Sequence, residues 1–142
     1  AAVEGRFLGL PALAVSLVGA DPRHFDTAGQ AVRTLLMRLI DEPLPPDTIL
    51  NINVPDVPVD ELRGFQSTRL GYRHKAEPVV TAEDPKGKTV FWVGAAGPGQ
   101  DAGAGTDFHA VEHGYVSVTP LQIDLTRHEA VAPLADWLPE SV

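Results

Sequence analysis

The chain has 142 residues, of which 44% are hydrophobic, and a formal net charge of −8 at pH 7. This length suits one compact domain, and the acidic balance, with lysines and arginines scattered singly, argues against a nucleic-acid duplex or an anionic membrane as a partner. The absence of cysteine excludes disulfides, thiolate zinc sites and cysteine nucleophiles, and no apolar run approaches the roughly 20 residues that span a bilayer, so we expect a soluble, cytoplasmic protein.

The first residues resemble the end of a helix more than its beginning. Residues 1–8 have no capping residue ahead of them, and Gly9 followed by Pro11 is a helix stop. We therefore expect the chain to be a piece of a longer protein.

A strand, a helix and a second strand follow. Residues 11–17 form an apolar run of strand length bounded by Gly and Pro, which predicts a buried parallel strand. Apolar residues then recur at helical spacing over residues 28–40, with Thr27 and Gln30 as a capping box. Residues 49–54 predict the next strand, so the segment is a βαβ unit of an α/β sheet.

Two amides, Asn51 and Asn53, share one face of this second strand, and apolar residues occupy the other. Two interpretations are open. The amides approach a ligand at the end of the sheet, or they satisfy backbone groups of nearby loops.

A β-hairpin arm is predicted after a further strand at residues 64–70. Residues 77–82 and 88–94 flank Asp84-Pro85-Lys86-Gly87, which favours a type I turn. A lone two-stranded ribbon is marginal in water, so we expect its apolar residues to pack against a second copy of the chain. These residues, which point to both faces, are Val79, Val80, Val90, Phe91, Trp92 and Val93.

Residues 94–105 form a glycine-rich loop with two open interpretations. One is a phosphate cradle or mobile lid over an active site, and the other is a flexible connector between the arm and the core. The glycine spacing matches neither a Walker A loop nor a dinucleotide fingerprint.

A loop, helix and strand follow. Thr106 predicts the N-cap of a short helix and Asp107 favours its positive end, while Gly114 predicts its stop. Residues 115–119 predict a strand that Pro120 ends. A Gly-rich approach to a capped helix start can bind anions.

The tail predicts a short amphipathic helix over residues 127–138. Asp124 and His128, four residues apart at its entrance, can pair if the helix begins early. The pair is either a hinge lock or an incidental surface contact.

One sequence pattern suggests zinc. His109, Glu112 and His113 match H-x-x-E-H, in which two imidazoles hold zinc and the glutamate is the general base. The helix is only two turns long and the motif arises easily by chance. We therefore interpret the pair as two solvated histidines on a short surface helix.

Three charged residues have both a functional and a structural interpretation. Asp101 and Asp107 are either a carboxylate pair for metal-assisted hydrolysis or, for Asp107, a charge at a helix start. Arg69 is the cation best suited to a substrate phosphate, because its fork matches phosphate oxygens, although a salt bridge is the alternative.

Five segments carry a family resemblance in order and spacing: residues 4–17, 50–55, 68–71, 105–107 and 114–121. They resemble the SurE (survival protein E) family of 5′-nucleotidases, of which the chain matches only the C-terminal half. The resemblance implies the C-terminal part of a Rossmann-like three-layer α/β core with a protruding β-hairpin arm and a C-terminal helix.

The resemblance also implies a function for the parent protein. The family hydrolyses nucleoside 5′-monophosphates with a divalent metal, for which Mg or Mn is expected. From the apolar arm we also expect the protein to assemble with itself, as a dimer or a tetramer. Its metal ligands, a pair of adjacent aspartates, a serine and an asparagine, precede Ala1, so we expect no catalytic or metal residue here and no activity from this chain alone. The alternative is a non-catalytic oligomerisation or binding module.

The chain then divides into four parts. Residues 1–74 are the second part of the core, 75–106 the arm and glycine loop, 107–123 a helix and strand returning to the core, and 124–142 a C-terminal helix, exchanged between subunits. The residues expected on the substrate side are Gly105, Thr106, Asp107 and Arg69.

Overall fold

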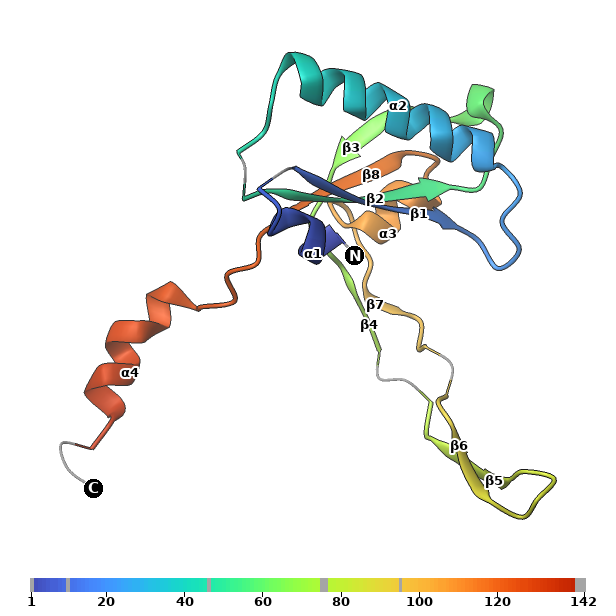
Figure 1. Ribbon diagram of the computed structural model, residues 1–142, viewed down its shortest axis with the longest axis vertical. Helices are drawn as coiled ribbons and strands as arrows, with labels where there is room; N and C mark the ends of the chain where they lie inside the picture. The colour runs from blue at the N-terminus through green and yellow to red at the C-terminus, as the bar shows by residue number, and fades with distance from the viewer. Residues whose placement is uncertain (1, 10, 46, 75–76, 95, 140–142) are drawn as a thin grey trace.

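A small sheet with helices on both faces forms the centre of the molecule (Figure 1). The computed structural model describes residues 2–9, 11–45, 47–74, 77–94 and 96–139. Residue 1, residues 75, 76 and 95 of the predicted arm and residues 140–142 of the predicted tail therefore lie outside the described part. The three-layer α/β core expected from the sequence is confirmed, whereas the four-part division stays a prediction.

Four strands make the central sheet in the order β1-β2-β8-β3. Strand β1 runs parallel to β2, β8 antiparallel to β2, and β3 parallel to β8. Their bounds are Ala12–Val18 for β1, Ile49–Pro55 for β2, Phe65–Ser67 for β3 and Val116–Leu121 for β8.

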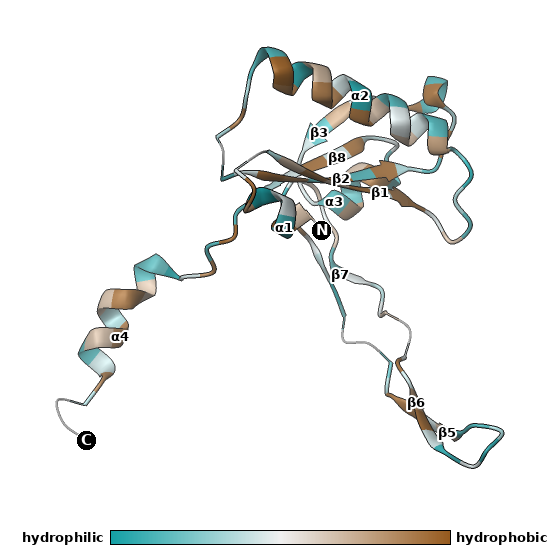
Figure 2. Ribbon diagram, viewed as in Figure 1, coloured by the Kyte–Doolittle hydropathy of each residue, from teal (hydrophilic) through white to brown (hydrophobic). Residues whose placement is uncertain are grey.

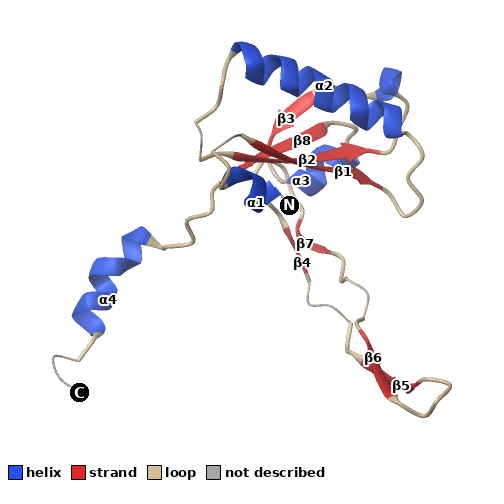
Figure 3. Cartoon of the chain, viewed as in Figure 1, coloured by secondary structure: helices blue, strands red, loops and turns tan. Residues whose placement is uncertain are grey.

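The long helix α2, Phe25–Asp41, covers one face of the sheet, and α1, Ala2–Arg6, and α3, Asp107–Glu112, lie on the other (Figures 1 and 3). The predicted βαβ unit is therefore confirmed. A 3-10 helix, Val59–Glu61, follows β2. The buried core between α2 and the sheet consists of Ala31, Leu50, Ile52, Val54 and Val116.

The start of α2 differs from the prediction. The helix begins after His24, and Thr27 lies inside its first turn, so no capping box forms with Gln30. Thr27 is buried, and its hydroxyl donates instead to the carbonyl of Val57 at 2.8 Å. This bond ties the helix to the loop after β2, which local sequence could not reveal.

The end of β8 also differs. Pro120 was predicted to end the strand, but β8 continues to Leu121, with Pro120 opposite Leu50 of β2. Strand β3 pairs with β8 only as far as Val118. Pro120 therefore has a strand neighbour on one side only, a position where proline is tolerated.

The predicted arm is confirmed as two consecutive ribbons (Figure 1). Strand β4, Tyr72–Arg73, pairs with β7, Gly99–Asp101, at the base, and β5, Val80–Glu83, pairs with β6, Thr89–Trp92, at the tip. The glycine-rich segment was predicted as a loop throughout, which is wrong for β7. Pairing with β4 outweighs its low strand propensity.

The tip of the arm turns as predicted. Gly87 N–H donates to the Asp84 carbonyl at 2.9 Å, and the Asp84 carboxylate accepts from the N–H groups of Lys86 and Lys88. Gly87 has φ +76°, which suits glycine.

The tail leaves the core after β8. A 3-10 helix, His128–Ala130, precedes α4, Val131–Trp137, and all residues of α4 are exposed. The predicted pairing of Asp124 with His128 is confirmed, with Oδ2 and Nε2 2.6 Å apart. Among the described helices none combines the length and apolar character that crossing a membrane requires.

Three buried hydroxyls join β8 to the end of β3. The Thr68 hydroxyl lies 2.8 Å from that of Ser117 and 2.7 Å from that of Thr119. All three residues are buried. A buried hydroxyl without a hydrogen-bond partner destabilises the fold. The hydrogen bonds among these three hydroxyls therefore help to hold the end of β3 against β8.

We predict that Thr68→Val lowers the free energy of unfolding by about 1–3 kcal/mol, because it leaves the hydroxyls of Ser117 and Thr119 without their partner. Urea denaturation measures the change. Thr81→Val, at an exposed position of the arm, is the control and should shift stability by less than about 0.5 kcal/mol. Equal effects of the two substitutions would contradict the prediction.

Candidate functional site

A cavity of about 730 Å³ lies at the carboxyl ends of β1 and β2. Its size falls within the usual range for small-molecule sites, and ligands of open α/β sheets bind outside the carboxyl ends of the strands. The ends of β1 and β2, helix α3 and the base of the arm all contribute to it. Its lining residues are Ser16, Leu17, Val18, Gly19, Asn53, Arg73, Gly99, Ala102, Asp107, Phe108, Val111 and Glu112.

Asp107 connects three segments that border this cavity. Its Oδ1 accepts from the N–H of Gly71 at 2.8 Å and from that of Phe108 at 3.0 Å. Its Oδ2 accepts from Asn53 Nδ2 at 3.5 Å, the limit of a hydrogen bond. The carboxylate thus joins the base of the arm, α3 and β2.

The predicted N-cap is confirmed. Thr106 is fully buried, and its hydroxyl accepts from His109 N–H at 3.2 Å while donating to the Gly103 carbonyl at 2.7 Å. Gly105 has φ +86°, which a residue with a Cβ adopts only under strain. The sharp turn into α3 therefore depends on this glycine and on the cap.

The structure brings the four predicted substrate-side residues together. Arg69 N–H donates to the Gly105 carbonyl at 3.0 Å, and Asp107 N–H donates to the Arg69 carbonyl at 3.1 Å. Of the four, Asp107 lines the cavity. Arg69, Gly105 and Thr106 are not among the lining residues; hydrogen bonds connect them to one another and to the start of α3.

The side chain of Arg69 is engaged by Asp101. Its Nη2 donates to Asp101 Oδ1 at 2.8 Å, and its Nη1 donates to the other carboxylate oxygen. The hydrogen bond raises the pKa of Arg69 and lowers the pKa of Asp101. Asp101 and Asp107 therefore have separate partners: a guanidinium for Asp101, and backbone N–H groups with the amide of Asn53 for Asp107.

The two histidines of the H-x-x-E-H pattern contact each other. The rings of His109 and His113 stack with centroids 4.0 Å apart, and His113 Nδ1 lies 2.8 Å from the His109 carbonyl oxygen. No group of three or more His, Cys, Asp or Glu side chains that could hold a metal occurs within the residues that the structure describes. The described residues therefore do not by themselves offer a site that fits a divalent cation.

Sequence reasoning missed Phe108 and Arg73. The Arg73 guanidinium carbon lies 4.9 Å from the centroid of the Phe108 ring. The two residues are far apart in sequence, and hydrogen bonds between Asp107 and both Gly71 and Arg69 join the base of the arm to the start of α3 beside them. No local pattern signals such a contact.

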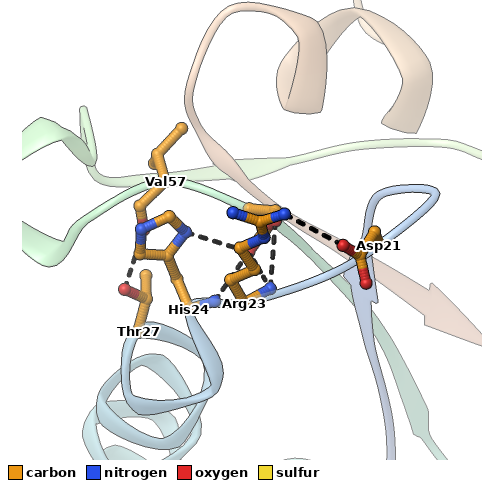
Figure 4. Close-up of polar contacts among 6 residues, drawn as sticks. Asp21, Arg23, His24, Thr27 and Val57 are labelled. Carbon is orange, nitrogen blue, oxygen red and sulfur yellow. Dashed lines mark hydrogen bonds and ion pairs between the residues drawn. The ribbon is translucent and has the colours of Figure 1, made fainter.

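A second carboxylate, that of Asp56, connects the end of β2 to the loop before α2; Figure 4 shows the polar contacts around Arg23, His24, Thr27 and Val57 in this region. Asp56 follows β2, and its Oδ1 accepts from the N–H groups of Arg23 at 3.0 Å and His24 at 2.8 Å, while His24 Nδ1 lies 3.0 Å away. These backbone hydrogen bonds, first that of His24 and then that of Arg23, lower the pKa of Asp56.

Asp56 also lies close to the backbone of Gly19. Gly19 lines the cavity, and a Cβ added to it would lie 3.4 Å from Asp56 Cβ. The segment after β1 and the segment after β2 therefore pack closely at this point. Asp56 therefore holds the loop between β1 and α2 against the end of β2.

Comparison with known proteins gives consistent matches. A family model described as Survival protein SurE matches residues 1–77. The chain is 63% identical over 142 residues to the 5′-nucleotidase SurE of Methylococcus capsulatus. The match covers 100% of this chain and 57% of the Methylococcus protein. It is 57% identical over 138 residues to the 5′-nucleotidase SurE of Nitrosococcus oceani. This match covers 97% of this chain and 55% of the Nitrosococcus protein.

A solved structure agrees with these matches. The crystal structure of the SurE protein from Aquifex aeolicus superimposes with a TM-score of 0.77 at 37% identity, covering 96% of this chain and 55% of that one. The Rossmann-like character of the core is thereby confirmed. The chain spans little more than half the length of the curated relatives it matches.

We predict that Asp56→Asn destabilises the protein at neutral pH and that the difference from wild type shrinks in acid. The pKa of Asp56 is lower in the folded than in the unfolded chain. The stabilisation of the folded state by the Asp56 carboxylate is therefore complete above the pKa of the unfolded chain, about 4. It is lost as the pH falls through the lower pKa of the folded chain. Urea midpoints at pH 7 and below pH 4 measure this.

The control for this prediction is Asp60→Asn, which removes an exposed carboxylate from the 3-10 helix after β2. It should leave the urea midpoint nearly unchanged at both pH values. A difference between wild type and Asp56→Asn that does not vary with pH would contradict the assigned role of the charge.

Proposed function

Since the chain belongs to the SurE family, we propose that it is the C-terminal part of an enzyme that hydrolyses nucleoside 5′-monophosphates. Water attacks phosphorus in this reaction, and the products are a nucleoside and inorganic phosphate. The observation that carries the proposal is the 63% identity over all 142 residues to a protein named as a 5′-nucleotidase.

This chain would supply one side of the substrate site. The support is the position of the cavity at the carboxyl ends of β1 and β2. Gly105, Thr106, Asp107 and Arg69 would form its supporting turn, because backbone hydrogen bonds join Arg69 to both Gly105 and Asp107. For Arg69 to reach a phosphate, its guanidinium would first have to leave Asp101.

We also propose that the parent enzyme requires a divalent cation, Mg²⁺ or Mn²⁺, held by residues outside this chain. The described residues offer no group of ligands for it. We assign the protein to the cytoplasm, which agrees with the absence of cysteine from the sequence.

The arm and α4 would hold subunits together as a dimer or tetramer. Five of the six arm residues are more than half exposed, and Val93 is 86% exposed. Figure 2 shows hydrophobic colour on the β5–β6 ribbon, which lies away from the core, as well as on the core strands. On α4, Trp137 is 77% exposed. A two-fold partner that accepts both elements would bury this apolar surface.

We predict that a protein of the relatives' full length releases phosphate from nucleoside 5′-monophosphates when a divalent cation is present. Residues 1–142 alone should release none, because the described residues contain no group of three or more His, Cys, Asp or Glu side chains that could hold the metal. A colorimetric phosphate assay on both samples, each verified by mass, measures this. Turnover by residues 1–142 alone would contradict the proposed division of the site.

We predict that replacing residues 79–93 with a short glycine linker in the full-length protein reduces the oligomer to a smaller, less soluble species. The substitution removes the apolar surface that would join the subunits. Light scattering gives the mass. Lys86→Ala, at the exposed polar tip of the arm, is the control and should preserve the oligomer. An unchanged mass after the deletion would exclude the arm as the interface.

A further inference from the structure

The cavity at the ends of β1 and β2 has walls that a phosphate group does not need. Leu17, Val18, Ala102, Phe108 and Val111 provide apolar surface along it. A phosphate is bound by cations and N–H groups, and apolar walls disfavour it because they remove its water without replacing the lost hydrogen bonds. The apolar lining therefore favours an uncharged ligand group.

The ring of Phe108 is held in one orientation. A Cβ at Gly71 would lie 2.6 Å from Phe108 Cδ2, and a Cβ at Gly99 would lie 3.9 Å from Cδ1, so two glycine backbones pack against the ring. The Arg73 guanidinium contacts it as a cation–π pair, and Arg73 Nη1 also donates to the Gly97 carbonyl at 3.2 Å. Because Phe108 also lines the cavity, a ring held in this way can offer a planar ligand a surface on the side away from Arg73.

The charges of the lining residues also disfavour a phosphate in this cavity. Asp107 and Glu112 face it together with a single cation, Arg73, among its lining residues. Two carboxylates repel a phosphate dianion, whereas they accept hydrogen bonds from hydroxyl and amino groups. A nucleoside carries both kinds of donor.

Asn53 and Asp107 place an amide and a carboxylate side by side on the polar wall. Asp107 Oδ1 accepts from two backbone N–H groups, whereas among the described residues its Oδ2 has only the long contact with Asn53 Nδ2. Both side chains therefore keep hydrogen-bonding capacity on the cavity side. Together they can bond a group that has a donor and an acceptor on one edge, as nucleobases have.

We propose that this cavity binds the nucleoside part of the substrate, with the base stacked on Phe108 and its polar edge bonded by Asn53 and Asp107. The inference rests on the proposed hydrolysis of nucleoside 5′-monophosphates and assigns the phosphate to a position outside this cavity. The base then accounts for the aromatic wall, and the ribose hydroxyls account for the carboxylates.

The test uses the full-length protein and the substitution Phe108→Leu, which keeps the wall apolar but removes the stacking surface. We expect KM for adenosine 5′-monophosphate and the inhibition constant of adenosine to rise about tenfold. kcat/KM for ribose 5-phosphate, which has no base, and inhibition by inorganic phosphate should stay within about twofold. Phe65→Leu is the matched control, because Phe65 lies on β3 and outside the cavity lining, and it should leave all four values unchanged.

A second substitution fills the cavity instead of emptying it. Ala102→Leu should weaken adenosine and adenosine 5′-monophosphate but spare ribose 5-phosphate and phosphate, so the test does not depend on one variant folding. Equal losses for substrates with and without a base would overturn the inference, as would no loss for either. Failure of the unmodified protein to hydrolyse any nucleotide would overturn the proposed function, while adenosine binding weakened by Phe108→Leu would still support the cavity.

Discussion

The structure depends on the burial of β2 between two strands and beneath α2. Ile52 and Val54 are completely buried, and Leu50 nearly so. Because side chains alternate along a strand, this burial directs Asn51 and Asn53 to the opposite face, where α3 lies. One strand thereby provides both the core of the domain and a polar side chain for the cavity at its carboxyl end.

The turn before α3 positions the wall of the cavity that α3 provides. The buried hydroxyl of Thr106 caps the helix, and Asp107 binds the backbone of Gly71 and the amide of Asn53. Each partner comes from a different part of the chain. The wall is therefore held by hydrogen bonds to groups of low exposure rather than by the surface ion pair of Arg69 and Asp101, which contributes little in water.

The molecule leaves considerable apolar surface exposed. The arm tip and α4 project from the core in Figure 1, and their largest apolar side chains, Phe91, Trp92 and Trp137, are all more than 60% exposed. Burial of such surface is the main favourable contribution to association. The same physical effect that closes the core beneath α2 thus favours a partner for the arm and the tail.

The sequence by itself determined the elements whose residues interact locally. The apolar periodicity of α2, the alternation in β2, the Asp84–Gly87 turn and the Thr106 cap are all patterns within a few residues. The tertiary structure alone decided the contacts between distant segments. Thr27 bonds Val57 instead of capping α2, Pro120 lies in β8 beyond the end of β3, and Arg73 at the base of the arm meets Phe108 of α3. These depend on long-range packing, which local propensity and spacing do not encode.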